Sequence, residues 1–230
     1  MTRRTYLERR WPDAPMFQDV ATQWCADHSR RLLTLVWQAY DLLATNDLNE
    51  VAFEAEGEAR EESLNYLLAV RIDQCKREAP FYVVHLPPEQ AKRKRGKGSS
   101  PQPDIGFALY ENPRTVWPLE GKVLMHDRDV LAYLAEIEKN FIEARYATFS
   151  GEGAMLGYLM AGDPETALSH VRDALGCTLR NHPHFCQRPH KLSDHTRTNL
   201  PHPNSSADFV CHHLVLCLSL TPISTCSATS

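Results

Sequence analysis

Hydrophobic positions recur every three or four residues over residues 14–45 and 51–77, a spacing that predicts two helices near the start of the chain. A third helix is predicted from Asp127, placed as its N-cap, to about Tyr146. Asp163 is followed directly by proline, which is typical of a helix N-cap and first turn, and so predicts the start of a fourth helix.

Five other segments have the pattern of strands. Residues 81–86 are rich in β-branched and aromatic side chains, and residues 104–109 alternate between apolar and small or polar side chains. Residues 116–125 alternate in the same way, and residues 209–218 predict a last strand. Residues 153–161 are apolar on both sides, as in a central strand covered on both faces. The element order therefore predicts an α/β fold, a mixed central β-sheet flanked by helices.

The length of 230 residues fits one large domain with appendages. We expect residues 1–48 to form an N-terminal helical segment packed on the core, residues 49–218 to form the α/β domain, and residues 219–230 to be a disordered tail rich in Ser and Thr. The formal net charge of -4 argues against a surface that binds polyanions as a whole. Any contact with nucleic acid must therefore be local.

The chain starts with charged residues and not with an apolar run, so we expect no secretory signal. Its longest apolar runs, near residues 154–161 and 214–220, are too short to span a membrane. Its seven cysteines contain no CxxC pair, which suits free thiols in a reducing compartment. These features together predict a cytoplasmic protein without membrane contact.

The two strands around residue 112 are predicted to form a β-hairpin whose loop of about six residues spans 110–115. With that loop Asp104 falls opposite Gly121, and a shift of one residue places it opposite Glu120 or Lys122. Only the shifted register puts all the apolar side chains of the hairpin on one face, namely Ile105, Phe107, Leu109, Leu119 and Val123. The burial pattern thus predicts that the two carboxylates and the ammonium lie together.

This set of side chains has a recognisable chemistry. Asp104 and Glu120 supply the hard oxygen ligands that Mg²⁺ prefers. Lys122 can orient a water molecule, help to deprotonate it, or stabilise developing negative charge. A strand is a rigid support, so the spacing of such groups is set before a substrate arrives.

Pro103-Asp104, fifteen residues, and then Glu120-Gly121-Lys122 resembles the PD-(D/E)xK motif of restriction-endonuclease-like nucleases. The resemblance covers roughly residues 50–180. In that superfamily the motif lies on a β-hairpin followed by a helix and a further strand. The resemblance therefore implies a restriction-endonuclease-like core, here with an N-terminal helical extension.

The resemblance also implies roles for single residues. Asp104 and Glu120 would be metal ligands, the Gly121 carbonyl a third ligand, and Lys122 the catalytic lysine. Many members add a glutamate from the preceding helix. Glu61 is selected by the phase of the apolar stripe, and Glu58 and Glu62 remain open as alternatives.

The implied activity is Mg²⁺-dependent hydrolysis of phosphodiester bonds in DNA by an endonuclease, with Mn²⁺ as a substitute metal. Family habit favours a prokaryotic restriction or antiviral defence effector that acts with a protein partner or as a homodimer. The alternative is a catalytically weak or inactive subunit of the same fold that binds nucleic acid or a partner.

A basic segment precedes Asp104 and consists of Lys92, Arg93, Lys94, Arg95 and Lys97. It is either a loop that contacts phosphates at the mouth of the site or a solvated loop without that role. Because a nuclease of net negative charge needs a local basic patch, the sequence favours nucleic-acid binding at these five residues.

Seven of the eleven histidines lie between residues 182 and 213, together with Cys186 and Cys211. Because His and Cys are the usual zinc ligands, a zinc-dependent protein organised by this cluster remains an open alternative, although the spacing matches no closed zinc module. The other interpretation is that residues 181–207 form a polar loop. Some of its side chains are expected to face phosphates, among them Arg188, His190, Lys191, His195 and Arg197. Because His212 and His213 are adjacent in an apolar strand, one of the two is expected to point inward.

Overall fold

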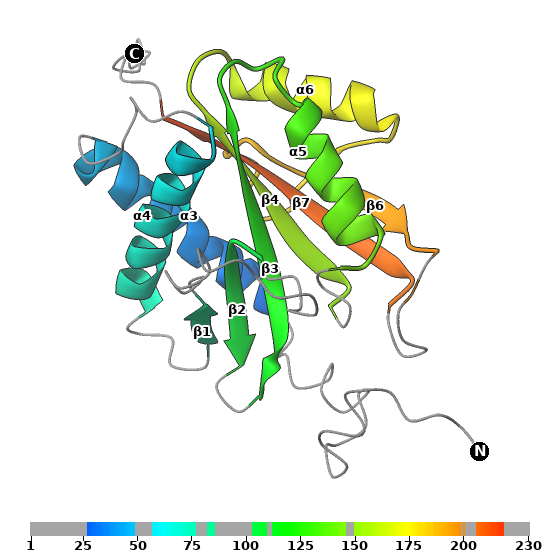
Figure 1. The fold of residues 1–230 in the computed structure, drawn as a ribbon, viewed down its shortest axis with the longest axis horizontal. Helices are drawn as coiled ribbons and strands as arrows, with labels where there is room; N and C mark the ends of the chain where they lie inside the picture. Colours follow the sequence, from blue (N-terminus) through cyan, green and yellow to red (C-terminus); the bar gives the residue numbers. More distant parts are fainter. Residues whose placement is uncertain are drawn as a thin grey trace, which may run out of the picture.

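The computed structural model describes residues 27–48, 57–76, 82–85, 103–109, 112–145, 150–198, 200 and 206–218. Their strands are β1 (Tyr82–His85), β2 (Ile105–Leu109), β3 (Asn112–Leu124), β4 (Glu152–Leu159), β5 (Arg180–Asn181), β6 (His190–Thr196) and β7 (Asp208–Cys217). Within the described residues these strands form one seven-stranded sheet in the order β1-β2-β3-β4-β7-β6-β5 (Figure 1). The sheet is mixed, because β3, β4 and β7 run parallel and the other pairs are antiparallel. The predicted α/β class with a mixed sheet is confirmed.

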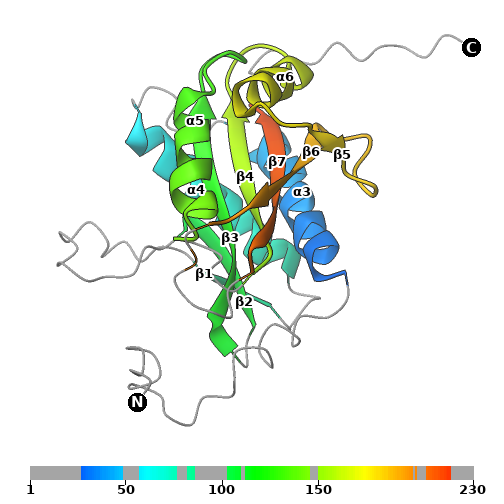
Figure 2. The ribbon, with the colours of Figure 1, turned by 90° about the vertical axis from the view of Figure 1, so that its right-hand side faces the viewer.

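Helices cover both faces of the sheet, as Figures 1 and 2 show. Their bounds are α3 (His28–Asn46), α4 (Glu58–Cys75), α5 (Leu131–Glu136), the π-helix η4 (Ile137–Ile142) and α6 (Pro164–Leu175). Helices α3 and α4 pack on one face of the sheet, and α5, η4 and α6 pack on the other. No helix in the described ranges combines the length and the apolar character needed to cross a membrane.

Strand β3 contributes side chains to both hydrophobic cores, because successive residues point to opposite faces of the sheet. Trp117 and Leu119 are buried against α3 and α4, whereas Leu124 is buried against the α5 and α6 side. Strand β4 is buried on both faces from Gly153 to Leu159, as predicted for a central strand. Two layers of helices thus hold the hairpin between them.

The hairpin has the shifted register that its burial pattern predicts. Ile105 pairs with Leu119 and Phe107 pairs with Trp117, so continuing the ladder by one step places Asp104 opposite Glu120. The predicted six-residue loop is wrong, because Leu109 already pairs with Asn112. The register shifts at a bulge between Ala108 and Leu109. The strands therefore pair almost to the turn, while the apolar residues before the bulge keep the predicted register.

The helix after the hairpin begins later than predicted. It starts at Leu131, and Asp127 lies in the preceding turn, where its carboxylate accepts the backbone N–H of Asp163 at 3.3 Å. From Ile137 the helix widens into a π-helix, with the N–H of Glu143 bonded to the carbonyl of Glu138. The predicted start of α6 is confirmed, because Asp163 caps it by accepting the N–H of Thr166 at 2.7 Å.

The prediction of a loop over residues 181–207 is wrong for its middle part. Strand β6 pairs with β7 along its whole length, and β5 pairs with β6. The polar sequence of β6 did not predict a strand, because His190 and Ser193 are polar residues whose side chains are buried in hydrogen bonds to residues remote in the sequence. His212 and His213 both point inward, and not one of the two, because β7 is covered on both faces.

The proposed division of the chain stays a prediction. Residues 1–26 and 219–230 lie outside the described residues, and so does the basic segment at residues 92–97. The described part of the N-terminal segment, α3, packs on α4 and on the sheet.

Candidate active site

The candidate site lies where strand β3 extends beyond the end of its partner strand β2. The ladder of β2 begins at Ile105, whereas β3 continues to Leu124, so among the described residues this edge of β3 is open beyond the ladder. Asp104 lies at this point, and its Oδ2 accepts the backbone N–H of Gly121 at 2.9 Å. Within the described part of the chain, the carboxylate thus takes the place of a strand partner for the Gly121 N–H.

Glu61 reaches the same edge from helix α4. Its Oε1 lies 2.5 Å from the Nζ of Lys122, and its carboxylate also accepts a backbone hydrogen bond at Val123. Of the three glutamates considered from the sequence, Glu61 is half-buried at the site, whereas Glu58 and Glu62 are exposed. The helical phase therefore identified the glutamate that contacts the lysine.

Glu120 is the most perturbed group of the site. Only 6% of its surface is exposed, and its Oε2 is buried without a hydrogen-bond partner in the described structure. Burial raises its pKa to about 9, and the nearby carboxylates of Asp104 and Glu136 act in the same direction. A protein rarely keeps a buried carboxylate in this state unless a cation or a proton compensates it.

Asp104 is perturbed in the same direction. Burial raises its pKa, against the lowering effects of the Gly121 N–H and the Lys122 ammonium. The charge of Asp104 in turn raises the pKa of Glu120, because two carboxylates in one dry site cannot both ionise freely. Without a cation, the pair retains a proton at neutral pH.

Lys122 carries the positive charge of the site. Burial, the largest effect, works against the ammonium, but the hydrogen bond and charge of Glu61 outweigh it, so the pKa of Lys122 is raised. Burial also raises the pKa of Glu61, although Lys122 lowers it in part. Lys122 is therefore an ammonium held in place by Glu61, suited to stabilise negative charge and not to accept a proton.

Gly121 is required by its surroundings. A Cβ at this position would lie 2.8 Å from the ring of Tyr158 and would overlap the side-chain carbonyl of Asn65. The same carbonyl accepts the Tyr158 hydroxyl at 2.7 Å. Because the N–H and C=O of one strand residue point to the same side, the Gly121 carbonyl faces the open edge together with Asp104.

Two residues of the site were not predicted from the sequence. Asn65 hydrogen-bonds Asp104 from helix α4, and it lies four residues after Glu61 on the same helix face, a spacing that could have identified it. Glu136 acts on both hairpin carboxylates from α5, and buried Asn140, one turn later, donates to it. The available signal for Glu136 was an asparagine one turn later, next to Phe141 of the apolar stripe.

The residues of the 181–207 region expected to face phosphates do not join the carboxylates. Two strands, β4 and β7, separate β6 from β3 in the sheet. Arg188 forms an ion pair with Asp41 at 2.7 Å, and buried Arg197 donates to the carbonyl of Phe141 at 2.8 Å. These cations are used within the fold. The five basic residues before Asp104 lie outside the described residues, so their role stays a prediction.

Comparison with protein-family models, with curated proteins and with solved structures finds no match to this chain.

Proposed function

We propose that this chain is a Mg²⁺-dependent nuclease of the PD-(D/E)xK type that hydrolyses phosphodiester bonds in DNA. One observation carries the proposal. The Oε2 of Glu120 is buried without a partner beside a second carboxylate, on the strand edge that also presents the Gly121 carbonyl. A cation is the simplest group that would satisfy this arrangement of oxygen atoms.

The donor set fits Mg²⁺. Asp104, Glu120 and the Gly121 carbonyl would hold the ion with hard oxygen atoms, and water and a substrate phosphate would complete its coordination. When bound, the ion would supply an activated water and would neutralise charge on the attacked phosphate.

The other residues have roles that follow from their own geometry. Lys122 presents an ammonium to the charge that develops on the phosphate. Glu61 keeps Lys122 in position through the 2.5 Å contact, and Asn65 orients Asp104. Since α4 supplies both of these supporting residues, the helix before the hairpin is part of the catalytic framework.

The proposal is tested with the purified full chain on supercoiled plasmid and on single-stranded DNA, with Mg²⁺, Mn²⁺ or a chelator. We expect metal-dependent cleavage that is lost in Asp104→Asn, Glu120→Gln and Lys122→Met. Glu138→Gln, an exposed glutamate in η4, is the matched control and should leave cleavage unchanged. Cleavage that persists in all three site variants would refute the assignment. DNA binding without cleavage would favour the alternative of a binding subunit of the same fold.

A further inference from the structure

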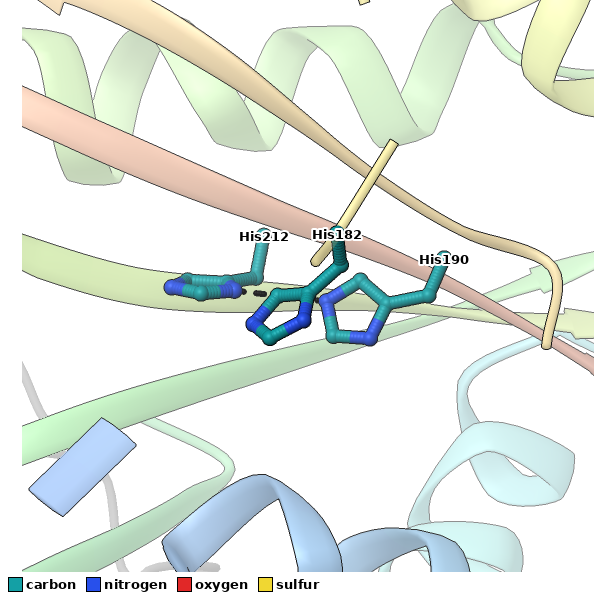
Figure 3. A group of neighbouring side chains, drawn as sticks. All are labelled: His182, His190 and His212. Carbon is teal, nitrogen blue, oxygen red and sulfur yellow. Dashed lines mark hydrogen bonds between the residues drawn. The ribbon is translucent and has the colours of Figure 1, made fainter. Parts of the chain in front are cut away.

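Three histidines from three segments meet on the α3 side of the sheet (Figure 3). His182 follows β5, His190 begins β6, and His212 lies in β7. Leu192 of β6 pairs with His212 of β7. His190 lies two residues before Leu192 on the same face of the sheet, so His190 is the diagonal neighbour of His212. All three imidazoles are buried, and one ring nitrogen from each lies within 4.8 Å of the others.

The spacing of the ring nitrogens suits a tetrahedral metal. The Nε2 of His190 lies 3.2 Å from the Nδ1 of His212. Zinc–nitrogen bonds of about 2.0–2.1 Å at a tetrahedral angle place two ligand nitrogens roughly 3.3 Å apart. The two rings thus already have the separation that a shared zinc ion requires.

Burial also favours the neutral form of two of the three rings. Burial lowers the pKa of His182 to about 4, and burial followed by the charge of His212 lowers that of His190. A neutral imidazole binds a metal, whereas an imidazolium does not.

A carboxylate lies behind one of these rings. The Oε2 of Glu152 is 3.6 Å from the Nε2 of His212 and accepts the hydroxyl of Ser29 from α3. Although burial alone would raise it, the contacts with His212 and Ser29 lower the pKa of Glu152 to about 2. An anionic carboxylate against the outer nitrogen of a histidine is the usual support of a metal-bound imidazole.

In the absence of metal, two N–H donors determine which ring nitrogen of His182 and of His190 carries the proton. The Trp37 indole N–H lies 3.3 Å from the Nδ1 of His190, and the backbone N–H of His184 lies 3.1 Å from the Nδ1 of His182. Both rings then carry their proton on Nε2. A metal bound at Nε2 of His190 requires the tautomer that carries its proton on Nδ1, so binding must break the contact with the Trp37 indole N–H and change the environment of Trp37.

We propose that His182, His190 and His212 form a second metal site, which binds zinc or another divalent transition metal that prefers imidazole, with Glu152 as the supporting carboxylate. The site is separate from the carboxylates of the hairpin and differs in chemistry, because nitrogen ligands select zinc, whereas oxygen ligands select Mg²⁺. A metal here would tie the segment around His182 to β6 and β7. Its role would be structural, because the three ligands are buried.

The test begins with the full chain after chelator treatment, titrated with Zn²⁺ and with Co²⁺ and followed by calorimetry, visible absorption and tryptophan fluorescence. We expect one ion per chain, a tetrahedral Co²⁺ spectrum and a change in tryptophan fluorescence. If the wild-type chain takes up no Zn²⁺, or gives no tetrahedral Co²⁺ spectrum, the proposal fails.

Variants then locate the ion. His182→Gln and His212→Gln should weaken Zn²⁺ binding at least about tenfold, and exposed His126→Gln should not change it. The Asp104→Asn, Glu120→Gln double variant should retain Zn²⁺. If that double variant loses Zn²⁺ while the histidine variants keep it, the ion sits at the hairpin and the second site does not exist. Should His212→Gln fail to fold, His182→Gln, outside the strands, still decides the location together with the wild-type titration.

Discussion

Glu120→Gln should stabilise the chain at neutral pH, although it changes a buried residue. The carboxyl of Glu120 is 6% exposed, and its Oε2 has no hydrogen-bond partner in the described structure. Because burial and the charges of Asp104 and Glu136 raise its pKa from 4.5 to about 9, the folded state must take up a proton that the unfolded state has lost. Glutamine has nearly the same shape and needs no proton.

The size and pH dependence of the effect follow from that pKa difference. Below pH 4.5 both states are protonated, so the variant has no advantage. Between pH 4.5 and 9 the advantage grows by about 1.4 kcal/mol per pH unit, which makes about 3 kcal/mol at pH 7. For a chain of this size, that corresponds to a melting temperature roughly 6–12 °C higher.

Thermal and urea unfolding of both proteins at pH 5 and pH 7 measure the effect. Glu138→Gln is the control for loss of one glutamate and should leave the stability nearly unchanged. Saturating Mg²⁺ should stabilise the wild type more than Glu120→Gln and so narrow the gap at pH 7. A variant that is less stable than the wild type at pH 7, or a gap of equal size at both pH values, would contradict the reasoning.

Three further outcomes are expected in urea unfolding. Gly121→Ala should lower the free energy of unfolding by about 1–3 kcal/mol, because its Cβ would lie 2.8 Å from the Tyr158 ring. Gly151→Ala, whose Cβ would have its nearest neighbour at 3.6 Å, should leave the free energy of unfolding unchanged. Tyr158→Phe should lose about 1 kcal/mol, because it removes the 2.7 Å hydrogen bond to Asn65. Asp163→Ala should lose about 1 kcal/mol through the N-cap of α6. Unchanged midpoints in Gly121→Ala, Tyr158→Phe or Asp163→Ala would each contradict the corresponding contact.

The hairpin shows which features of a strand pair the hydrophobic pattern of the sequence can predict. Ile105, Phe107 and Leu119 share a face only when the pairing is shifted by one residue, which predicts Asp104 opposite Glu120 or Lys122. The structure places it opposite Glu120. The loop length was misjudged because a bulge near Leu109 lets the strands pair further than an ideal ladder would. Apolar burial thus constrains register strongly and constrains turns weakly.

Strand β6 shows where the pattern has no information. His190 and Ser193 are buried by bonds to partners that lie far away in the sequence, His212 and His213. A polar side chain whose partner is remote looks the same in the sequence as one exposed to water. Such a strand can be recognised only when the partner strand is known.

The sequence by itself predicted the α/β class, most of the elements and the shared apolar face of the hairpin, because these depend on local periodicity. It left Asp104 opposite Glu120 or Lys122, and Glu58 and Glu62 as alternatives to Glu61; the structure decided for Glu120 and Glu61. Only the tertiary structure decided that Asn65 and Glu136 complete the carboxylate site and that His182, His190 and His212 converge. Those groups come from segments whose proximity is set by the sheet order and by the packing of two helix layers. That proximity is a property of the whole fold, and no stretch of the chain encodes it locally.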